Sequence, residues 1–193
     1  KTGNVIGLHG YPGVGKTSIG KAFAKSLNIP VVFIPLGGMS TSLTLCGSDY
    51  VYEGSSWGKI VSSLISTKCM NPIFFFDELD KISDTKEGND LSNLLIHLTH
   101  PTQNSEFTDK YFTGITFDLS RCFFIFSFND KNLIHPILKD RINLIKMDNF
   151  TDKDKVNIAI DYSLPKIIEN VGLDSSLFNI PRDTLAYIAI TYC

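Results

Sequence analysis

A glycine-rich segment that directly follows a short apolar run constrains the fold more than any other feature of this sequence. The segment Gly10-Tyr11-Pro12-Gly13-Val14-Gly15-Lys16-Thr17 fits the pattern G-x-x-x-x-G-K-[ST], and the run Val5–Leu8 precedes it. Because glycine lacks a Cβ, the backbone can curl closely around phosphate groups and direct its N–H groups inward, at the positive end of a following helix. The pattern therefore predicts a strand, a phosphate-binding loop and a helix in direct succession.

The polar residues of this loop predict a nucleotide site. Lys16 is placed to bridge the β- and γ-phosphates of a nucleoside triphosphate, and the Thr17 hydroxyl is placed to ligate Mg²⁺. A chance glycine-rich turn is the alternative, but the strand before the loop and the helix after it favour the phosphate loop. The candidate ATP-binding residues are Gly10, Tyr11, Pro12, Gly13, Val14, Gly15, Lys16, Thr17, Ser18 and Asp77.

A second apolar run, Ile73–Phe76, ends in two adjacent carboxylates, Asp77 and Glu78. An uninterrupted apolar run is typical of a strand that is buried on both faces of a parallel sheet. We expect Asp77 to hold Mg²⁺ together with Thr17, partly through water, and Glu78 to act as the base for the attacking water. The two segments together predict that the chain binds a nucleoside triphosphate and hydrolyses it.

Two further residues are candidates for the same chemistry. Asn129 follows the apolar run Cys122–Phe126, where its amide could orient the water, although a simple turn residue is the alternative. Arg141 precedes the last expected strand and is one of three arginines in the chain, so few guanidinium groups could contact phosphate. A surface ion pair with Asp140 is the alternative for Arg141.

Strand and helix patterns alternate up to about residue 150, and only helical patterns follow. The expected strands are Val5–His9, Val31–Ile34, Ile73–Phe76, Cys122–Phe126 and Ile142–Met147, with an edge strand or hairpin in Thr113–Leu119. The expected helices are Thr17–Leu27, Trp57–Thr67, Asp90–Thr99, Leu133–Leu138, Thr151–Ile160, Ile167–Val171 and Asp183–Tyr192. We expect loops in Met39–Ser56, which could also hold a short broken helix, and in the charged segment Ser83–Asn89.

This order predicts an α/β fold with a mostly parallel sheet flanked by helices over residues 1–150. Residues 151–193 are expected to form part of a small all-helical domain. The net charge of -2 gives no electrostatic reason to expect nucleic-acid or anionic-membrane binding. The widely spaced cysteines predict reduced thiols, and the absence of a signal-peptide pattern or a long apolar run predicts a soluble, intracellular protein.

Several short motifs give the chain a closer resemblance. It resembles the AAA+ ATPases, and within them the ATPase module of Lon proteases, from about residue 5 to residue 171. The motifs occur in the order of that family and are Gly15-Lys16-Thr17-Ser18-Ile19-Gly20-Lys21, Leu36-Gly37-Gly38, Asp77-Glu78-Leu79-Asp80-Lys81, Gln103–Tyr111, Phe117-Asp118-Leu119-Ser120 and Leu164-Pro165-Lys166.

The resemblance implies a role for each matching residue. Asp77 and Glu78 would form the Walker B pair, and Asn129 would be sensor 1. Arg141 would be the arginine finger that reaches the γ-phosphate of a neighbouring subunit, in a ring that is typically a hexamer. Tyr52 falls where the family has an aromatic pore-loop residue that grips a threaded polypeptide; an ordinary loop residue is the alternative.

The loops that would face a substrate depart from the family pattern. Glu53 replaces an apolar residue beside Tyr52, Ser48 and Asp49 replace basic residues, and Glu87 stands where the second pore loop usually has arginine. The ends of the chain imply an ATPase fragment of a longer protein, without the sensor 2 arginine and without peptidase residues. The resemblance thus implies ATP-driven unfolding and translocation of unfolded or tagged proteins, with a nucleotide-dependent assembly module as the alternative.

Overall fold

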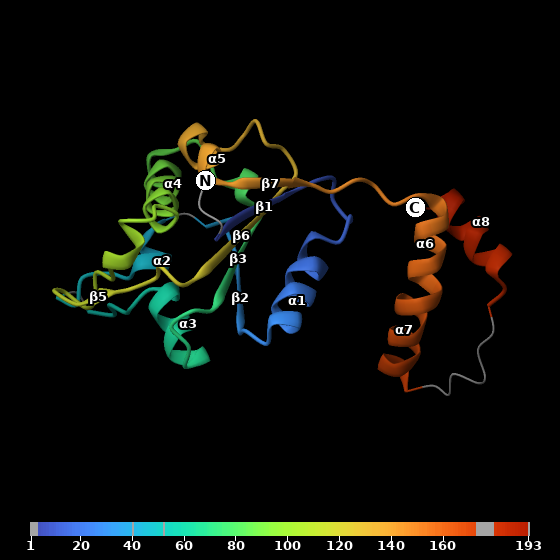
Figure 1. Cartoon of the computed structure of the whole chain (residues 1–193), viewed down its shortest axis with the longest axis horizontal. Coiled ribbons are helices and arrows are strands. Elements are labelled where there is room, and N and C mark those ends of the chain that lie inside the picture. Colours follow the sequence, from blue (N-terminus) through green and yellow to red (C-terminus); the bar gives the residue numbers. More distant parts are fainter. Residues whose placement is uncertain (1–3, 40, 52, 173–179, 193) are drawn as a thin grey trace. The chain divides into compact units, whose positions relative to one another are not determined.

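Five strands form a parallel sheet in the order β2-β3-β6-β1-β7 (Figure 1). The strands are β1 (Val5–His9), β2 (Val31–Pro35), β3 (Ile73–Asp77), β6 (Phe123–Phe128) and β7 (Asn143–Lys146). The structure, a computed structural model, describes residues 4–39, 41–51, 53–172 and 180–192. It divides into two units, Lys1–Met147 and Asp148–Cys193, and the sheet belongs to the first. The predicted α/β fold with a parallel sheet is confirmed.

Helices cover both faces of this sheet. Helix α1 (Lys16–Leu27) lies on one face, and α3 (Lys59–Thr67) and α4 (Lys86–Leu98) lie on the other (Figure 1). The short helices α2 (Leu43–Cys46) and α5 (Pro136–Arg141) and the 3₁₀ turns η1 (Leu79–Lys81) and η2 (Asn104–Glu106) complete the connections. Because parallel strands need crossover connections, the alternation of strands and helices in the sequence produces this layered arrangement.

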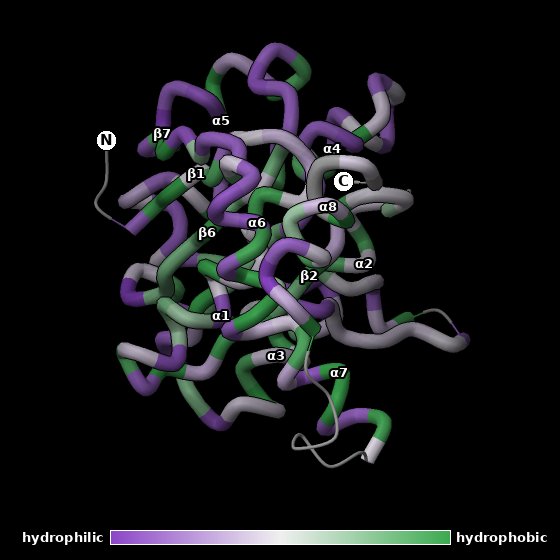
Figure 2. Tube along the Cα trace, turned by 90° about the vertical axis from the view of Figure 1, so that its right-hand side faces the viewer, coloured by the Kyte–Doolittle hydropathy of each residue, from purple (hydrophilic) through white to green (hydrophobic). Residues whose placement is uncertain are grey.

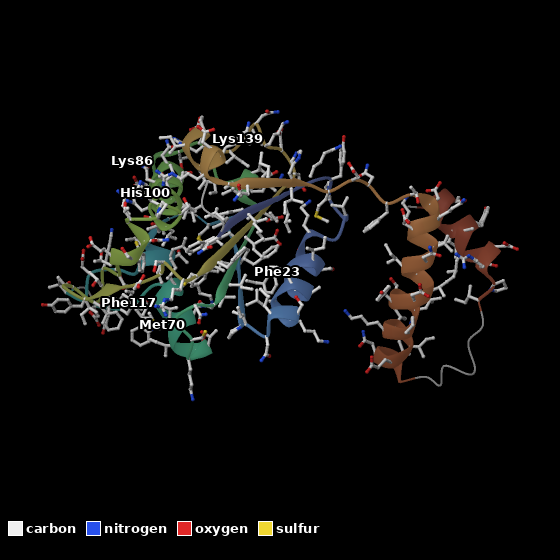
Figure 3. All side chains as sticks on the ribbon, in the orientation of Figure 1. Phe23, Met70, Lys86, His100, Phe117 and Lys139 are labelled. Carbon is white, nitrogen blue, oxygen red and sulfur yellow. The ribbon has the colours of Figure 1, made fainter. Side chains whose placement is uncertain are left out.

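Strand β3 contributes to the apolar layers on both faces. Phe75 packs with Ala24 of α1 on one face, whereas Phe74 and Phe76 belong to the larger cluster with α3 and α4 on the other. Each of these phenylalanines is fully buried, as the uninterrupted apolar run predicts. The neighbouring strands β2 and β6, which Figure 2 labels, are likewise hydrophobic segments. On the α1 face, Phe23 packs against Phe123 with ring centroids 5.4 Å apart (Phe23 is labelled in Figure 3).

In the first unit, two predicted helix starts were wrong by three or more residues, each because of a local signal, and in the second unit the helix predicted to begin at Ile167 begins at Leu164. Helix α4 begins at Lys86 and not near Asp90, since the Thr85 hydroxyl accepts a hydrogen bond from the Gly88 N–H (3.2 Å) and caps the helix. Part of the expected charged loop is therefore helical. Helix α5 begins at Pro136, which suits the first turn because its fixed φ matches the helix and its missing N–H is not needed there.

A small hairpin lies outside the main sheet. Strand β4 (Phe107–Thr108) pairs antiparallel with β5 (Thr116–Phe117). Of the edge strand and the hairpin that were expected for Thr113–Leu119, the structure contains the hairpin. Within the expected Met39–Ser56 loop, the short helix α2 forms.

The second unit is helical over its described residues. It contains α6 (Asp152–Ile158), the π-helical segment η3 (Ala159–Ser163), α7 (Leu164–Val171) and α8 (Arg182–Tyr192). The predicted capping signal at the start of α6 is confirmed, since Thr151 and Asp154 form a reciprocal capping box. The π segment precedes Pro165, whose missing N–H interrupts the regular hydrogen-bond ladder. Val156 and Leu185 form the buried centre of this unit.

The described cysteines Cys46, Cys69 and Cys122 are free thiols. Cys122 is fully buried, and burial raises the pKa of its thiol to about 12. Within the parts of the chain that the structure describes, no helix has the length and apolar character needed to cross a membrane.

Close packing of α1 on the sheet depends on Gly20. A Cβ at this position would lie 2.3 Å from the Phe75 ring, which is fully buried and cannot move aside. We expect Gly20→Val to lower the free energy of unfolding by about 1–3 kcal/mol, because overpacking forces core side chains and backbone to shift. Urea unfolding would measure this. Ala22→Val on the exposed side of the same helix is the matched control and should cost only about 0.5 kcal/mol through helix propensity; equal losses for both variants would contradict the packing argument.

Candidate functional site

The phosphate-loop sequence forms the connection between β1 and α1. Gly13 and Gly15 both have φ of 82°, a left-handed conformation that favours glycine, and Gly15 is the N-cap of α1. At Gly10 the chain passes so close to Met147 that a Cβ would lie 2.7 Å from its carbonyl oxygen. Val14 is buried and anchors the loop, whereas Tyr11 is exposed. The loop thus curls around the N-terminus of a helix of twelve residues, where unpaired N–H groups attract anions.

The Lys16 ammonium lies at the centre of the site. Its Nζ donates hydrogen bonds to the carbonyl oxygens of Gly10 (2.7 Å) and Tyr11 (2.9 Å) and to Oδ1 of Asn129 (2.8 Å). Burial lowers the pKa of Lys16, and the negative charges of Asp77 and Asp80 oppose that shift. Lys16 therefore joins the phosphate loop to the residue that follows β6.

Asp77 lies at the end of β3, between α1 and β6. Its Oδ2 lies 3.4 Å from the Thr17 hydroxyl, and its Oδ1 accepts a hydrogen bond from the Ser127 hydroxyl. A carboxylate beside a hydroxyl supplies the oxygen ligands that Mg²⁺ prefers, so these residues fit the predicted metal. Among the described residues, no group of three or more His, Cys, Asp or Glu side chains could hold a metal ion, at this site or at any other.

Glu78 occupies a different position from its neighbour. Its φ of 59° is left-handed, and its side chain is exposed. The carboxylate lies over Gly37, just past the end of β2, where a Cβ would come within 2.1 Å of Oε2. The absence of a side chain at Gly37 therefore leaves the room that the Glu78 carboxylate occupies.

Arg141 is the last residue of α5. Its Nη1 donates a hydrogen bond to the backbone carbonyl of Ile96 in α4. The structure thus pairs Lys16 with Asn129 and Thr17 with Asp77 at the N-terminus of α1, whereas the hydrogen bond of Arg141 goes to Ile96 of α4.

Tyr52, the predicted pore-loop residue, lies outside the described residues. Its neighbours Tyr50 and Val51 are exposed. The segment that carries them is closed at its base, since the N–H of Ser48 donates to the carbonyl of Ser56 (3.1 Å).

Ser127 and Asp80 are site residues that the motif reasoning did not single out. Ser127 is the one hydroxyl residue of β6, and it interrupts the apolar run Phe123–Phe128. That interruption was the available signal, because a buried hydroxyl needs a partner. Asp80 is buried, and its Oδ2 accepts hydrogen bonds from the backbone of Asn129 and Asp130.

Comparison with known proteins agrees with this arrangement. Residues 6–153 match the AAA family, the ATPase family associated with various cellular activities. The chain is 40% identical over 192 residues to a Lon protease homolog of Acanthamoeba polyphaga mimivirus. This match spans 99% of the chain and 19% of the relative's length.

Similar matches come from distant organisms. The Lon protease of Finegoldia magna is 38% identical over 98% of the chain and 24% of its own length. The mitochondrial Lon protease homolog of Drosophila melanogaster is 37% identical over 99% of the chain and 18% of its own length. The chain thus spans about a fifth to a quarter of the curated relatives that it matches. It belongs to the AAA family of ATPases, as an AAA+ module of the Lon type.

Proposed function

We propose that this chain binds ATP with Mg²⁺ and hydrolyses it at the phosphate loop. The observation that carries the proposal is the cluster in which Lys16 contacts Asn129 while Thr17 lies beside Asp77, at the N-terminus of α1. A lysine, a hydroxyl, a carboxylate and an amide at one helix N-terminus are the groups that phosphoryl transfer to water requires. We also propose that the first unit, extended to about residue 150, is the nucleotide-binding domain and that residues 151–193 begin its helical lid.

Each residue of the site contributes a distinct step. The loop N–H groups bind the phosphates, and the Lys16 ammonium exchanges one of its present acceptors for a phosphate oxygen. Thr17 and Asp77 hold Mg²⁺, which when bound offsets negative charge on the phosphates. Asn129 orients the attacking water through its side-chain amide, and the Glu78 carboxylate accepts the proton that the water loses.

Glu78→Gln tests the assignment of the base. The amide is nearly isosteric with the carboxylate but cannot accept the proton at neutral pH, so hydrolysis should fall by about 100-fold or more. ATP affinity should stay within about threefold of the original value, since Glu78 lies over Gly37 and not against the phosphate loop. Phosphate release in single-turnover experiments measures the first quantity and calorimetry the second.

The control for this variant is Glu87→Gln, which makes the same change at an exposed residue in the first turn of α4. It should leave the rate of phosphate release unchanged. Phosphate release at the original rate from Glu78→Gln would exclude Glu78 as the base. If the unmodified chain binds ATP but does not release phosphate at any protein concentration, the hydrolytic function itself is excluded.

Beyond ATP hydrolysis, we propose that the parent protein assembles into a ring and uses the module to unfold and thread proteins. The similarity to proteins named Lon protease favours this motor function over nucleotide-dependent assembly alone. The two functions make different predictions for Tyr52. If the module is a motor, Tyr52→Ala should abolish unfolding of a tagged substrate by the parent protein while ATP hydrolysis continues.

A further inference from the structure

Asp80 connects two strand ends that are distant in the sequence. It lies in the 3₁₀ turn η1 directly after β3, and it is only 6% exposed. Its Oδ2 accepts hydrogen bonds from the N–H groups of Asn129 and Asp130, each at 3.1 Å. Strands β3 and β6 are neighbours in the sheet. The Asp80 carboxylate, which follows β3, therefore holds the backbone of the turn that follows β6.

The other carboxylate oxygen of Asp80 has a different environment. Oδ1 is buried and has no hydrogen-bond partner among the described residues. Burial of a carboxylate with an unsatisfied oxygen is unfavourable, and such groups call for an explanation beyond packing. The explanation lies in the residue whose backbone it holds, because the Asn129 side chain contacts Lys16 (2.8 Å).

A continuous path therefore runs from Asp80 through the Asn129 backbone and side chain to Lys16. Where Oδ1 of Asn129 accepts from Lys16, the opposite end of the amide carries the two N–H donors. The direction of these donors is set by the backbone at residue 129, which is where Asp80 acts. A small rotation of this turn would move the amide away from Lys16 and redirect its donors.

We propose that Asp80 is a positioning residue for ATP hydrolysis: it fixes the turn after β6 so that the Asn129 amide faces Lys16 and the attacking water. This inference rests on the proposed hydrolytic function. Asp80 acts through Asn129 and contacts neither the phosphates nor the water. Removal of its carboxylate should therefore lower kcat and leave KM nearly unchanged.

A double-mutant cycle tests the proposal through the kinetics. Asp80→Ala should lower kcat about 10- to 100-fold, the range expected when a reacting group is misplaced by about 1 Å. In an Asn129→Ala background the same change should have little further effect on kcat, because the side chain that Asp80 positions is gone. An equal loss of kcat in both backgrounds would overturn the proposal. Asp84→Ala, at an exposed carboxylate four residues on, is the matched control and should leave kcat unchanged.

The free energy of unfolding, measured beside kcat, distinguishes a positioning role of Asp80 from a merely structural one. The N–H of residue 129 persists in Asn129→Ala, so Asp80→Ala should lower the urea midpoint in both backgrounds even though it lowers kcat in only one. Asp80→Asn should restore most of kcat, since its amide oxygen can accept both backbone hydrogen bonds. Failure of Asp80→Asn to exceed the kcat of Asp80→Ala would count against the geometry.

A spectroscopic readout keeps the proposal testable without turnover. In ¹⁵N-labelled protein, Asp80→Ala should speed the hydrogen exchange of the Asn129 and Asp130 amides and shift the Asn129 side-chain NH₂ resonances, whereas Asp80→Asn should largely preserve the exchange rates of both amides. Lys16→Ala should shift the same NH₂ resonances, whereas Asp84→Ala should not. Unshifted NH₂ resonances in Asp80→Ala would overturn the proposal. A chain that shows the expected shifts but hydrolyses no ATP would instead refute the proposed function alone.

Discussion

Lys16→Ala should weaken ATP binding by roughly 100- to 1,000-fold, with hydrolysis lost in proportion. Lys16 supplies the ammonium at the centre of the phosphate loop, and charge-assisted hydrogen bonds each contribute about 1.5–3 kcal/mol. Its present acceptors, which include the carbonyls of Gly10 and Tyr11, show that the loop orients the ammonium toward its own concave side. Calorimetric titration with ATP and Mg²⁺ would measure the change.

The fold should survive this substitution, because the Lys16 side chain is only half-buried and Tyr11, one of its backbone partners, is exposed. Circular dichroism on heating would verify that the variant is folded. Lys25→Ala is the matched control, since Lys25 is exposed in the last turn of the same helix and far along it from the loop. ATP affinity that is unaltered in Lys16→Ala, or equally reduced in Lys25→Ala, would refute the site assignment.

The sheet was predictable from the sequence because its strands carry strong local signals. Buried parallel strands read as unbroken apolar runs, and Ile73–Phe76 and Val5–His9 form strands as expected. Helix starts were harder to predict, since a single hydroxyl decides them. Thr85 moves the start of α4 into a segment whose charges are typical of a loop.

The loop and the residues at the ends of the central strands were predictable in kind, since glycines, lysine and adjacent acidic residues leave a recognisable pattern. Their partners were not. Ser127 meets Asp77, and Asp80 meets the turn at Asn129, only because β3 and β6 are adjacent in the sheet. Sheet order and register come from packing of the whole chain, so no local pattern encodes these contacts.

Arg141→Ala should lower ATP hydrolysis by roughly 1,000-fold at protein concentrations where the chain self-associates, and should leave ATP binding to the isolated chain intact. The expected loss is that of an arginine finger, which offsets charge on the transferred phosphoryl group. The reason to expect action across a subunit boundary is the resemblance to the AAA+ ATPases, and the contacts agree with it, since Arg141 contacts Ile96 of α4 while Lys16 contacts Asn129. An arginine held outside the phosphate cluster of its own chain can act on the cluster of a neighbour.

Concentration dependence distinguishes action on a neighbour from action within one chain. For the original sequence, phosphate release per molecule should rise steeply with protein concentration, because each complete site needs two copies. Mixing an excess of Glu78→Gln, which retains Arg141, with Arg141→Ala should restore hydrolysis, since each variant lacks a different half of the shared site. Arg121→Ala, at an exposed arginine, is the control and should need no complementation. Loss of ATP binding by the Arg141→Ala monomer, or no restoration on mixing, would assign Arg141 to the structure of its own chain through the Ile96 carbonyl.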